Sequence, residues 1–402
     1  MPVTVIKDVL EEHFEELQIL LEQRQANLRS PLRTLRHLQE LDERIETHVQ
    51  GLLIGDDETI HLLCDGLASD DLSVIFASAY TLLRFGTRDE AIRVIEAFRV
   101  ARPSQYDSFC QALCHGPIIP IISELQLMLA SSPPGIDVRA AEILAFHGFH
   151  DLGPARLESF LIDPNPYVRQ VGWRITSRIN IPLSRKIYEE GMQDKDLDVR
   201  REAMFAAGWN RNGWLLDYCR RLAASPSSEH YDAYLLLAVL GKADDLDLMC
   251  KLGSSKDLGA ERLRLLGAFG HPAVIEPLIF FMRDGELRLM ITAGEAFEKI
   301  TGENILSLER VQLLPEDGHE PDEFEREFLD EAFLPDPNKA QAYWNKVKSP
   351  YHKGLRWCRG SDIGEGFNRE TADLLDLESR WEAYFRAAFR GEVNESPLKL
   401  VS

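Results

Sequence analysis

A sequence element that recurs about every 31 residues constrains this fold more than any other feature. The segment DPNPYVR, from Asp163 to Arg169, aligns without gaps with DKDLDVR, from Asp194 to Arg200. Further copies place the same point at Val74, Val138, Val168, Val199, Ala260 and Leu289, with unmarked repeats predicted near Tyr106 and His230. Helical patterning with a period of about 30 to 45 residues is typical of stacked helix pairs. The sequence therefore predicts an all-α protein.

Each period is predicted to contain a helix, a turn and a second helix. After Val199 come Ala203, Ala206 and Ala207 at helical spacing, and such small side chains allow helices to approach closely. Glycines that suit a left-handed C-terminal cap follow the predicted second helices at Gly86, Gly148, Gly208, Gly241 and Gly270. The next first helices are predicted to begin at Pro154, Pro182 and Pro272. One pair buries too little apolar surface to stand alone, so stacking is predicted to be obligatory.

The charge balance bears on the class of partner. The chain of 402 residues carries 45 Lys and Arg against 66 Asp and Glu, a net charge of −21. A surface of that sign repels phosphate backbones and anionic lipid head groups, so we expect neither nucleic acid nor membrane as a partner. The N-terminus lacks a basic segment followed by an apolar one, and we expect a cytoplasmic protein. The six irregularly spaced cysteines are expected to be mostly small buried hydrophobes.

The repeats divide the chain into four predicted regions. Residues 1–54 are expected to form an N-terminal helical cap, from two helices that break at Ser30 and Pro31. Residues 55–302 are predicted to form the repeat array. The remainder is predicted to comprise an acidic linker, 303–338, and a small mixed or helical C-terminal subdomain, 339–402.

Two neighbouring blocks of opposite charge mark the C-terminal part. The segment from Glu316 to Glu331 holds nine acids and one arginine, whereas Lys339 to Arg359 holds only basic charges. This pattern predicts that the two blocks face each other, although exposed ion pairs contribute only a fraction of a kcal/mol each.

The Asp-x4-Val-Arg element resembles the HEAT-like family of helical repeats over roughly residues 56–302. The resemblance implies an α-solenoid of about eight helix pairs. Asp163 and Asp194 look like turn or N-cap acceptors. The arginines that follow the core valines look like a ladder against neighbouring turn carboxylates, and the alternative is a row that grips an anionic ligand: Arg139, Arg169 and Arg200.

A closer resemblance runs nearly end to end. It rests on the segment LDERI at 41–45 with His48, Gly51 and Leu52; on AGEAF at 293–297 with Ile300, Thr301 and Gly302; and on Pro335, Asp336 and Pro337 with Trp344. These residues are similar to those of an uncharacterised proteobacterial HEAT-repeat family, often encoded near type VI secretion components. The resemblance implies an accessory or adaptor role in handling secreted proteins and brings no catalytic residues with it.

The sequence contains only incomplete versions of known metal-binding motifs. Asp194, Asp196 and Asp198 have the spacing of half a calcium loop, but the required glycine and glutamate are missing. Cys110, Cys114 and His115 resemble a partial zinc site without a second ligand pair. We therefore expect no catalytic, cofactor-binding or metal-ligating residues and no enzymatic activity.

Aromatic residues on the predicted second helices are the best candidates for binding a partner. Together with the three arginines of the ladder they are Trp173, Trp209, Tyr231 and Tyr234. The alternative is that these aromatic side chains fill the core between stacked units.

The function predicted from these observations is a protein-interaction scaffold or adaptor, with an accessory or chaperone-like role for type VI secretion cargo as its narrower form. Two alternatives stay open. One is a bilin lyase-like activity, since HEAT-like repeats also occur in proteins that attach bilins. The other is nucleic-acid binding through the basic block 339–359 and the arginine row, against which the net charge argues.

Overall fold

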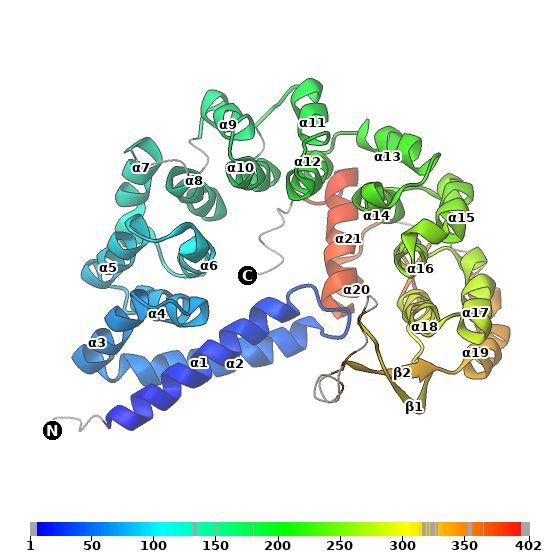
Figure 1. Ribbon diagram of the computed structural model, residues 1–402, viewed down its shortest axis with the longest axis horizontal. Coiled ribbons are helices and arrows are strands. Elements are labelled where there is room, and N and C mark those ends of the chain that lie inside the picture. Colours follow the sequence, from blue (N-terminus) through cyan, green and yellow to red (C-terminus); the bar gives the residue numbers. More distant parts are fainter. Residues whose placement is uncertain are drawn as a thin grey trace. The chain divides into compact units, whose positions relative to one another are not determined.

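The computed structural model describes residues 6–131, 135–149, 152–179, 181–315, 319, 321, 326, 329–351, 356–364 and 366–394. The protein is mostly helical, in agreement with the predicted all-α class. The chain divides into two compact units, which Figure 1 shows in sequence colours. Unit 1 comprises Met1–Asn210, Asp376–Trp381 and Asn394–Ser402, and unit 2 comprises Arg211–Leu375 and Glu382–Val393.

Unit 1 contains the first twelve α-helices. Their bounds are α1 (Lys7–Asn27), α2 (Leu35–Leu53), α3 (Asp56–Leu67), α4 (Leu72–Arg84), α5 (Arg88–Arg99), α6 (Tyr106–His115), α7 (Ile122–Ser131), α8 (Ile136–Phe146), α9 (Pro154–Leu161), α10 (Pro166–Arg178), α11 (Arg185–Gly191) and α12 (Leu197–Trp209). The 3-10 turns Pro103–Gln105 and Ile119–Ile121 precede α6 and α7. Unit 1 also includes the first turn of α21 (Leu377–Arg390).

Unit 2 continues the helix pairs and adds two small sheets. Its helices are α13 (Leu215–Ala223), α14 (Tyr231–Leu240), α15 (Leu246–Ser254), α16 (Glu261–Phe269), α17 (Ile275–Asp284), α18 (Leu287–Thr301), α19 (Pro337–Tyr351), α20 (Arg369–Leu374) and the rest of α21. The 3-10 turns Ser228–His230, Ala243–Asp245, Lys256–Leu258 and Pro272–Val274 precede α14 to α17. Strand β1 (Leu306–Gln312) pairs antiparallel with β2 (Glu331–Pro335), and β3 (Trp357–Cys358) pairs with β4 (Ser361–Asp362).

The predicted repeat points coincide with helix starts. Each of the eight lies within two residues of the first residue of a helix, namely α4, α6, α8, α10, α12, α14, α16 or α18. Within unit 1 these helices pack in succession from α4 to α12, and within unit 2 from α14 to α18. The core valines Val138, Val168 and Val199 are fully buried, as predicted.

The repeated turn explains where these helices begin. Asp163 accepts from the backbone N–H of Asn165 at 2.8 Å, and Asp194 accepts from that of Asp196 at 3.0 Å, so both act as turn acceptors. The N-cap role belongs to the residue two positions later, since Asn165 caps α10 and Asp196 caps α12. The periodic Asp therefore orients the turn, and its neighbour stabilises the helix.

The predicted glycine caps and proline helix starts are right in part. Gly86, Gly148 and Gly270 have φ values of 75°, 81° and 69°, the left-handed region that favours glycine. The prediction is wrong for Gly208, which lies inside α12, and for Gly241, whose φ of −60° is ordinary. Pro154 and Pro272 stand at the first helical position as predicted, whereas Pro182 precedes α11 by three residues.

The range predicted as an acidic linker contains β1 and β2, and most of its acidic segment 316–331 lies outside the described residues. Two of the three segments that carry the closer resemblance, 293–302 and 335–344, meet in unit 2. A Cβ on Gly294 would lie 2.7 Å from Pro335, and Phe297 of α18 contacts Tyr343 of α19 at 6.3 Å between ring centroids. Arg359, from the basic block, pairs with Glu298 at 2.8 Å.

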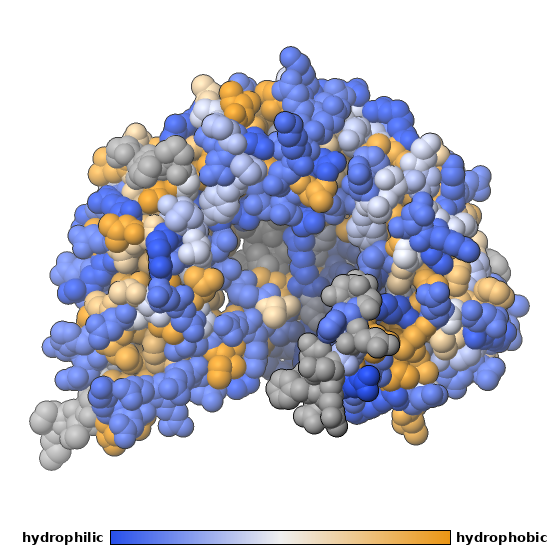
Figure 2. Space-filling view, in the orientation of Figure 1, coloured by the Kyte–Doolittle hydropathy of each residue, from blue (hydrophilic) through white to orange (hydrophobic). Residues whose placement is uncertain are grey.

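The face seen in Figure 2 is predominantly hydrophilic, and exposed apolar side chains are interspersed with polar ones. No helix in the described part of the chain has both the length and the apolar composition to cross a membrane. All six cysteines are free thiols, four of them buried. Among the described residues no three His, Cys, Asp or Glu side chains are placed to hold a metal ion.

Candidate partner-binding site

The aromatic residues predicted to bind a partner lie mostly in the core. Trp173 is 1% exposed and Tyr234 is fully buried, where its hydroxyl accepts from the backbone N–H of Ser227 at 2.9 Å. Trp209 is also buried, and half-buried Tyr231 donates to Glu261 at 3.1 Å. Trp173 and Tyr234 are thus inaccessible to a partner, which corresponds to the alternative that the sequence left open.

Trp173 fills the space between two repeats, where its ring packs against Tyr188 at 5.3 Å and against the backbone of Gly191. A Cβ on Gly191 would lie 2.3 Å from Cζ2 of Trp173. We therefore expect Gly191→Ala to lower the free energy of unfolding by about 1–3 kcal/mol, because neither helix can retreat without opening a cavity. Gly153→Ala, which meets no atom within 4 Å, is the matched control. Equal urea denaturation midpoints for the two variants would contradict this packing.

The three predicted arginines take three different roles. Arg169 forms the ladder contact, a bidentate pair with Asp194 at 2.7 and 2.8 Å. Arg200 does not continue the ladder, because its buried Nε has no hydrogen-bond partner in the described part of the chain. Arg139 is turned instead toward Asp107, Glu142 and the hydroxyl of Tyr167.

Arg139 belongs to a buried ion cluster that joins α8 and α10. Glu142 of α8 accepts from Arg178 at 3.0 Å, pairs with Nε of Arg174 at 3.1 Å, and bonds Arg139 one turn earlier on its own helix. Burial alone raises the pKa of Glu142, but the three guanidinium groups outweigh burial and hold its pKa well below the ordinary value. We call these four residues the Glu142 cluster.

A second arginine site adjoins this cluster in unit 1. The α1–α2 loop is held against the first turn of α21, because the backbone N–H of Leu377 donates to the carbonyl of Arg33 at 2.8 Å and that of Glu378 to the carbonyl of Ser30 at 3.3 Å. This pairing sets the guanidinium of Arg29 over the ring of Trp381, 4.3 Å from its centroid. We call this pair the Arg29–Trp381 site.

Two aromatic residues of α12 hold Trp381 in place. Phe205 and Trp209 meet its ring edge to face, with centroids 5.5 and 6.1 Å away. The guanidinium of Arg29 thus lies on a platform built from two elements far apart in sequence. Trp209 therefore contributes to this site indirectly, by holding the ring of Trp381 in place.

Arg29 is exposed, and its guanidinium has no hydrogen bond or ion pair within the described residues. The surrounding protein still lowers its pKa by desolvation, which Glu202 opposes. Glu202, on α12, likewise forms no hydrogen bond or ion pair within the described part of the chain, and burial raises its pKa against the attraction of Arg174, Arg29 and Arg178. The site therefore offers an unpaired planar donor, stacked on an indole, to an acceptor from outside.

No sequence signal marks this site. Arg29 lies in a loop outside the repeat, and Trp381 lies far along the chain, in the predicted C-terminal subdomain. Within the Glu142 cluster, the four-residue spacing of Arg174 and Arg178 on one helix face was the readable hint.

No family model and no curated protein sequence matches this chain. Among solved structures, the X-ray structure of YibA from Escherichia coli is similar at 13% identity and a TM-score of 0.31, covering 75% of this chain and 98% of that chain. The crystal structure of an engineered protein is similar at 13% identity and a TM-score of 0.31, covering 73% of this chain and 85% of that one. Likeness at this level carries no argument about fold or function.

Proposed function

We propose that this protein is a non-enzymatic interaction scaffold, a HEAT-like α-solenoid that binds a protein partner. The succession of packed second helices within each unit supports the architecture. The observation that carries the binding role is Arg29, an exposed residue whose guanidinium stacks on Trp381 and has no hydrogen bond or ion pair within the described residues. Arginine and tryptophan are the residue types that dominate interface energetics.

The chemistry of the site favours an acidic segment of the partner. A guanidinium binds a carboxylate through two parallel hydrogen bonds, and stacking on an indole fixes the plane of the fork in advance. Four arginines gather here, Arg29 with the three of the Glu142 cluster, against the carboxylates of Glu142, Glu202 and Asp107. The local field is therefore positive although the chain as a whole carries −21.

We expect Arg29→Ala to lower recovery of the partner by about tenfold or more, the loss typical of an arginine hot spot. The measurement is in-cell crosslinking followed by quantitative mass spectrometry of the proteins retained by wild type and variants. Arg36→Ala is the matched control, since Arg36 lies exposed on α2 and pairs only with Glu40 one turn away. Circular dichroism should show equal folding of all three proteins.

The proposal fails if wild type retains no specific partner. It also fails if wild type, Arg29→Ala and Arg36→Ala retain the same partners in equal amounts. The identity of the recovered protein also decides the narrower form of the proposal, an adaptor for type VI secretion cargo, whose support is the sequence resemblance. A secreted effector or secretion component among the Arg29-dependent proteins is expected under that form.

A further inference from the structure

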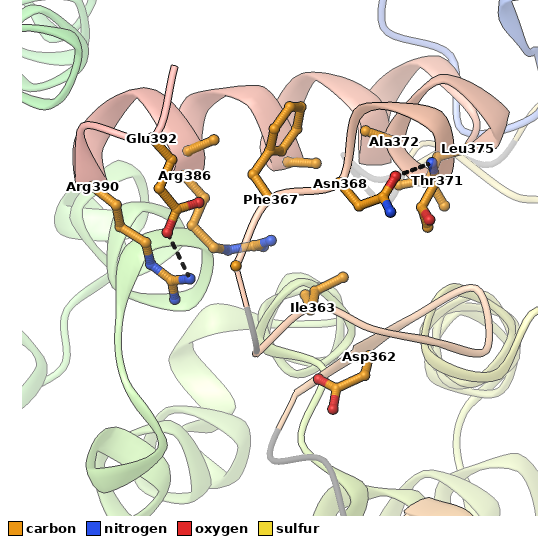
Figure 3. A pocket seen from close by; sticks show the side chains of 13 residues that line it. Asp362, Ile363, Phe367, Asn368, Thr371, Ala372, Leu375, Arg386, Arg390 and Glu392 are labelled. Carbon is orange, nitrogen blue, oxygen red and sulfur yellow. Dashed lines mark hydrogen bonds and ion pairs between the residues drawn. The ribbon is translucent and has the colours of Figure 1, made fainter.

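Unit 2 contains a small pocket of about 50 Å³ that the proposed scaffold function does not use. The segment from β4 to α20 forms one wall, and the second half of α21 forms the other (Figure 3). Asp362, Phe367, Asn368 and Thr371 line the first wall, and Arg386 and Arg390 reach in from α21. A space of this size, enough for several water molecules, holds a small acid group while the rest of a ligand extends outward.

The feature that marks this pocket is the side chain of Arg386. Only 5% of the residue is exposed, and its Nε donates to the carbonyl of Val239 at 2.8 Å. Its two terminal nitrogens have no hydrogen-bond or ion-pair partner among the described residues, and the guanidinium is directed into the pocket in Figure 3. Since Arg386 lines the pocket, an acceptor bound there can take charge-assisted hydrogen bonds from these nitrogens.

The charges around Arg386 leave a positive excess. Arg356 is fully buried beside it and bonds only main-chain carbonyls, while Arg390 lies 3.9 Å from Glu392. Glu382, the nearest carboxylate on α21, is engaged by Lys299 at 2.8 Å. The pocket is lined by two arginines, Arg386 and Arg390, and two carboxylates, Asp362 and Glu392, and the buried charge of Arg356 beside Arg386 leaves one positive charge in excess.

We propose that this pocket binds the carboxylate of a small monoanionic organic acid through the terminal nitrogens of Arg386. The amide of Asn368 is fixed by the bond from the Thr371 N–H to its Oδ1 at 3.0 Å, so its NH₂ group is left to donate. The ring of Phe367, packed on Tyr384 at 4.8 Å, supplies an apolar surface for the rest of the ligand. Asp362 and Glu392 disfavour a dianion such as phosphate.

A free acid and the C-terminal carboxylate of a peptide share this chemistry, and the test separates them. Ligand-observed NMR on the full chain would use four probes: benzoate, benzamide, an N-acetylated tripeptide with a free carboxylate, and inorganic phosphate. We expect benzoate to bind more tightly than the other three. Binding of the tripeptide but not of benzoate would overturn the free-acid assignment, and phosphate binding more tightly than benzoate would overturn the monoanion assignment.

Variants then tie binding to the pocket. Arg386→Lys keeps the charge but loses the fork, and we expect about tenfold weaker benzoate binding. Thr371→Phe fills the pocket without touching Arg386, and it should abolish binding even if the first variant folds poorly. Arg283→Gln, an exposed position of α17 in the same unit, is the control. The proposal that the pocket binds a carboxylate would be refuted if benzoate does not bind to wild type, or if binding is unchanged in the first two variants. Neither outcome affects the Arg29 experiment, which tests the proposed scaffold function.

Discussion

Replacing Arg356 with alanine is expected to lower the free energy of unfolding by about 3–5 kcal/mol, because buried carbonyl oxygens would lose their donor and each one left unsatisfied costs about 1–3 kcal/mol. Arg356 is 2% exposed and donates to five carbonyl oxygens at the C-terminal ends of two helices. Ala238 and Val239 of the last turn of α14 supply two of them and its C-cap Gly241 a third, and the other two belong to Ala268 and Phe269 of α16. Terminal helix carbonyls lack intrahelical partners, and buried ones need another donor.

A single guanidinium therefore donates hydrogen bonds to the terminal carbonyls of two helices. Its positive charge also interacts favourably with the negative ends of both helix dipoles. Urea denaturation monitored by circular dichroism measures the loss, and Arg283→Ala, exposed in the same unit, is the control. Equal midpoints for the two variants would show that the carbonyls find other donors or water.

The second large effect is expected for Glu142→Gln, which removes the carboxylate that Arg139, Arg174 and Arg178 share. Arg139, Arg174 and Arg178 would be left as neighbouring positive charges, at a cost of about 3–5 kcal/mol near neutral pH. Glu40→Gln is the control, because Glu40 is exposed and pairs only with Arg36 on the surface of α2.

The pH dependence of this effect has a definite sign. The pKa of Glu142 is lower in the folded protein than its ordinary value of 4.5, so its stabilising contribution is complete above about pH 4.5 and declines as the pH falls toward the folded pKa. The difference in unfolding free energy between wild type and Glu142→Gln should therefore shrink on acidification below that value. A difference that grows or stays constant in the acid range would contradict the ionised state of Glu142.

The helix pairs could be predicted from sequence because their signals are local. The spacing of Val168 and Val199, the turn carboxylate of Asp194 and the small residues of α12 all act within one period, and helix starts follow from them. The ion pair of Arg169 could also be predicted, since its partner Asp194 belongs to the next copy of the same turn. Arg200 breaks this rule because Ser225 stands where the corresponding next-turn residue falls.

The sites could not be predicted because their partners are distant or carry no sequence signal. Arg356 appeared as one charge of a basic block expected to face the acidic segment, yet it bonds main-chain carbonyls more than 80 residues earlier. Every residue has a main-chain carbonyl, so no sequence motif predicts this contact. Trp173 shows the related limit for aromatic residues: its position on a second helix is readable, but whether its ring faces core or solvent depends on the neighbouring Gly191.

The division of unit 1 has a consequence for biosynthesis. The loop that carries Arg29 emerges from the ribosome long before Asp376–Trp381, which completes the same unit. In the interval the nascent chain exposes a positively charged loop without its indole platform. Arg29 can acquire its stacked geometry only once Trp381 has been synthesised, so a truncated product that stops at Asn210 would lack the means to hold its ligand.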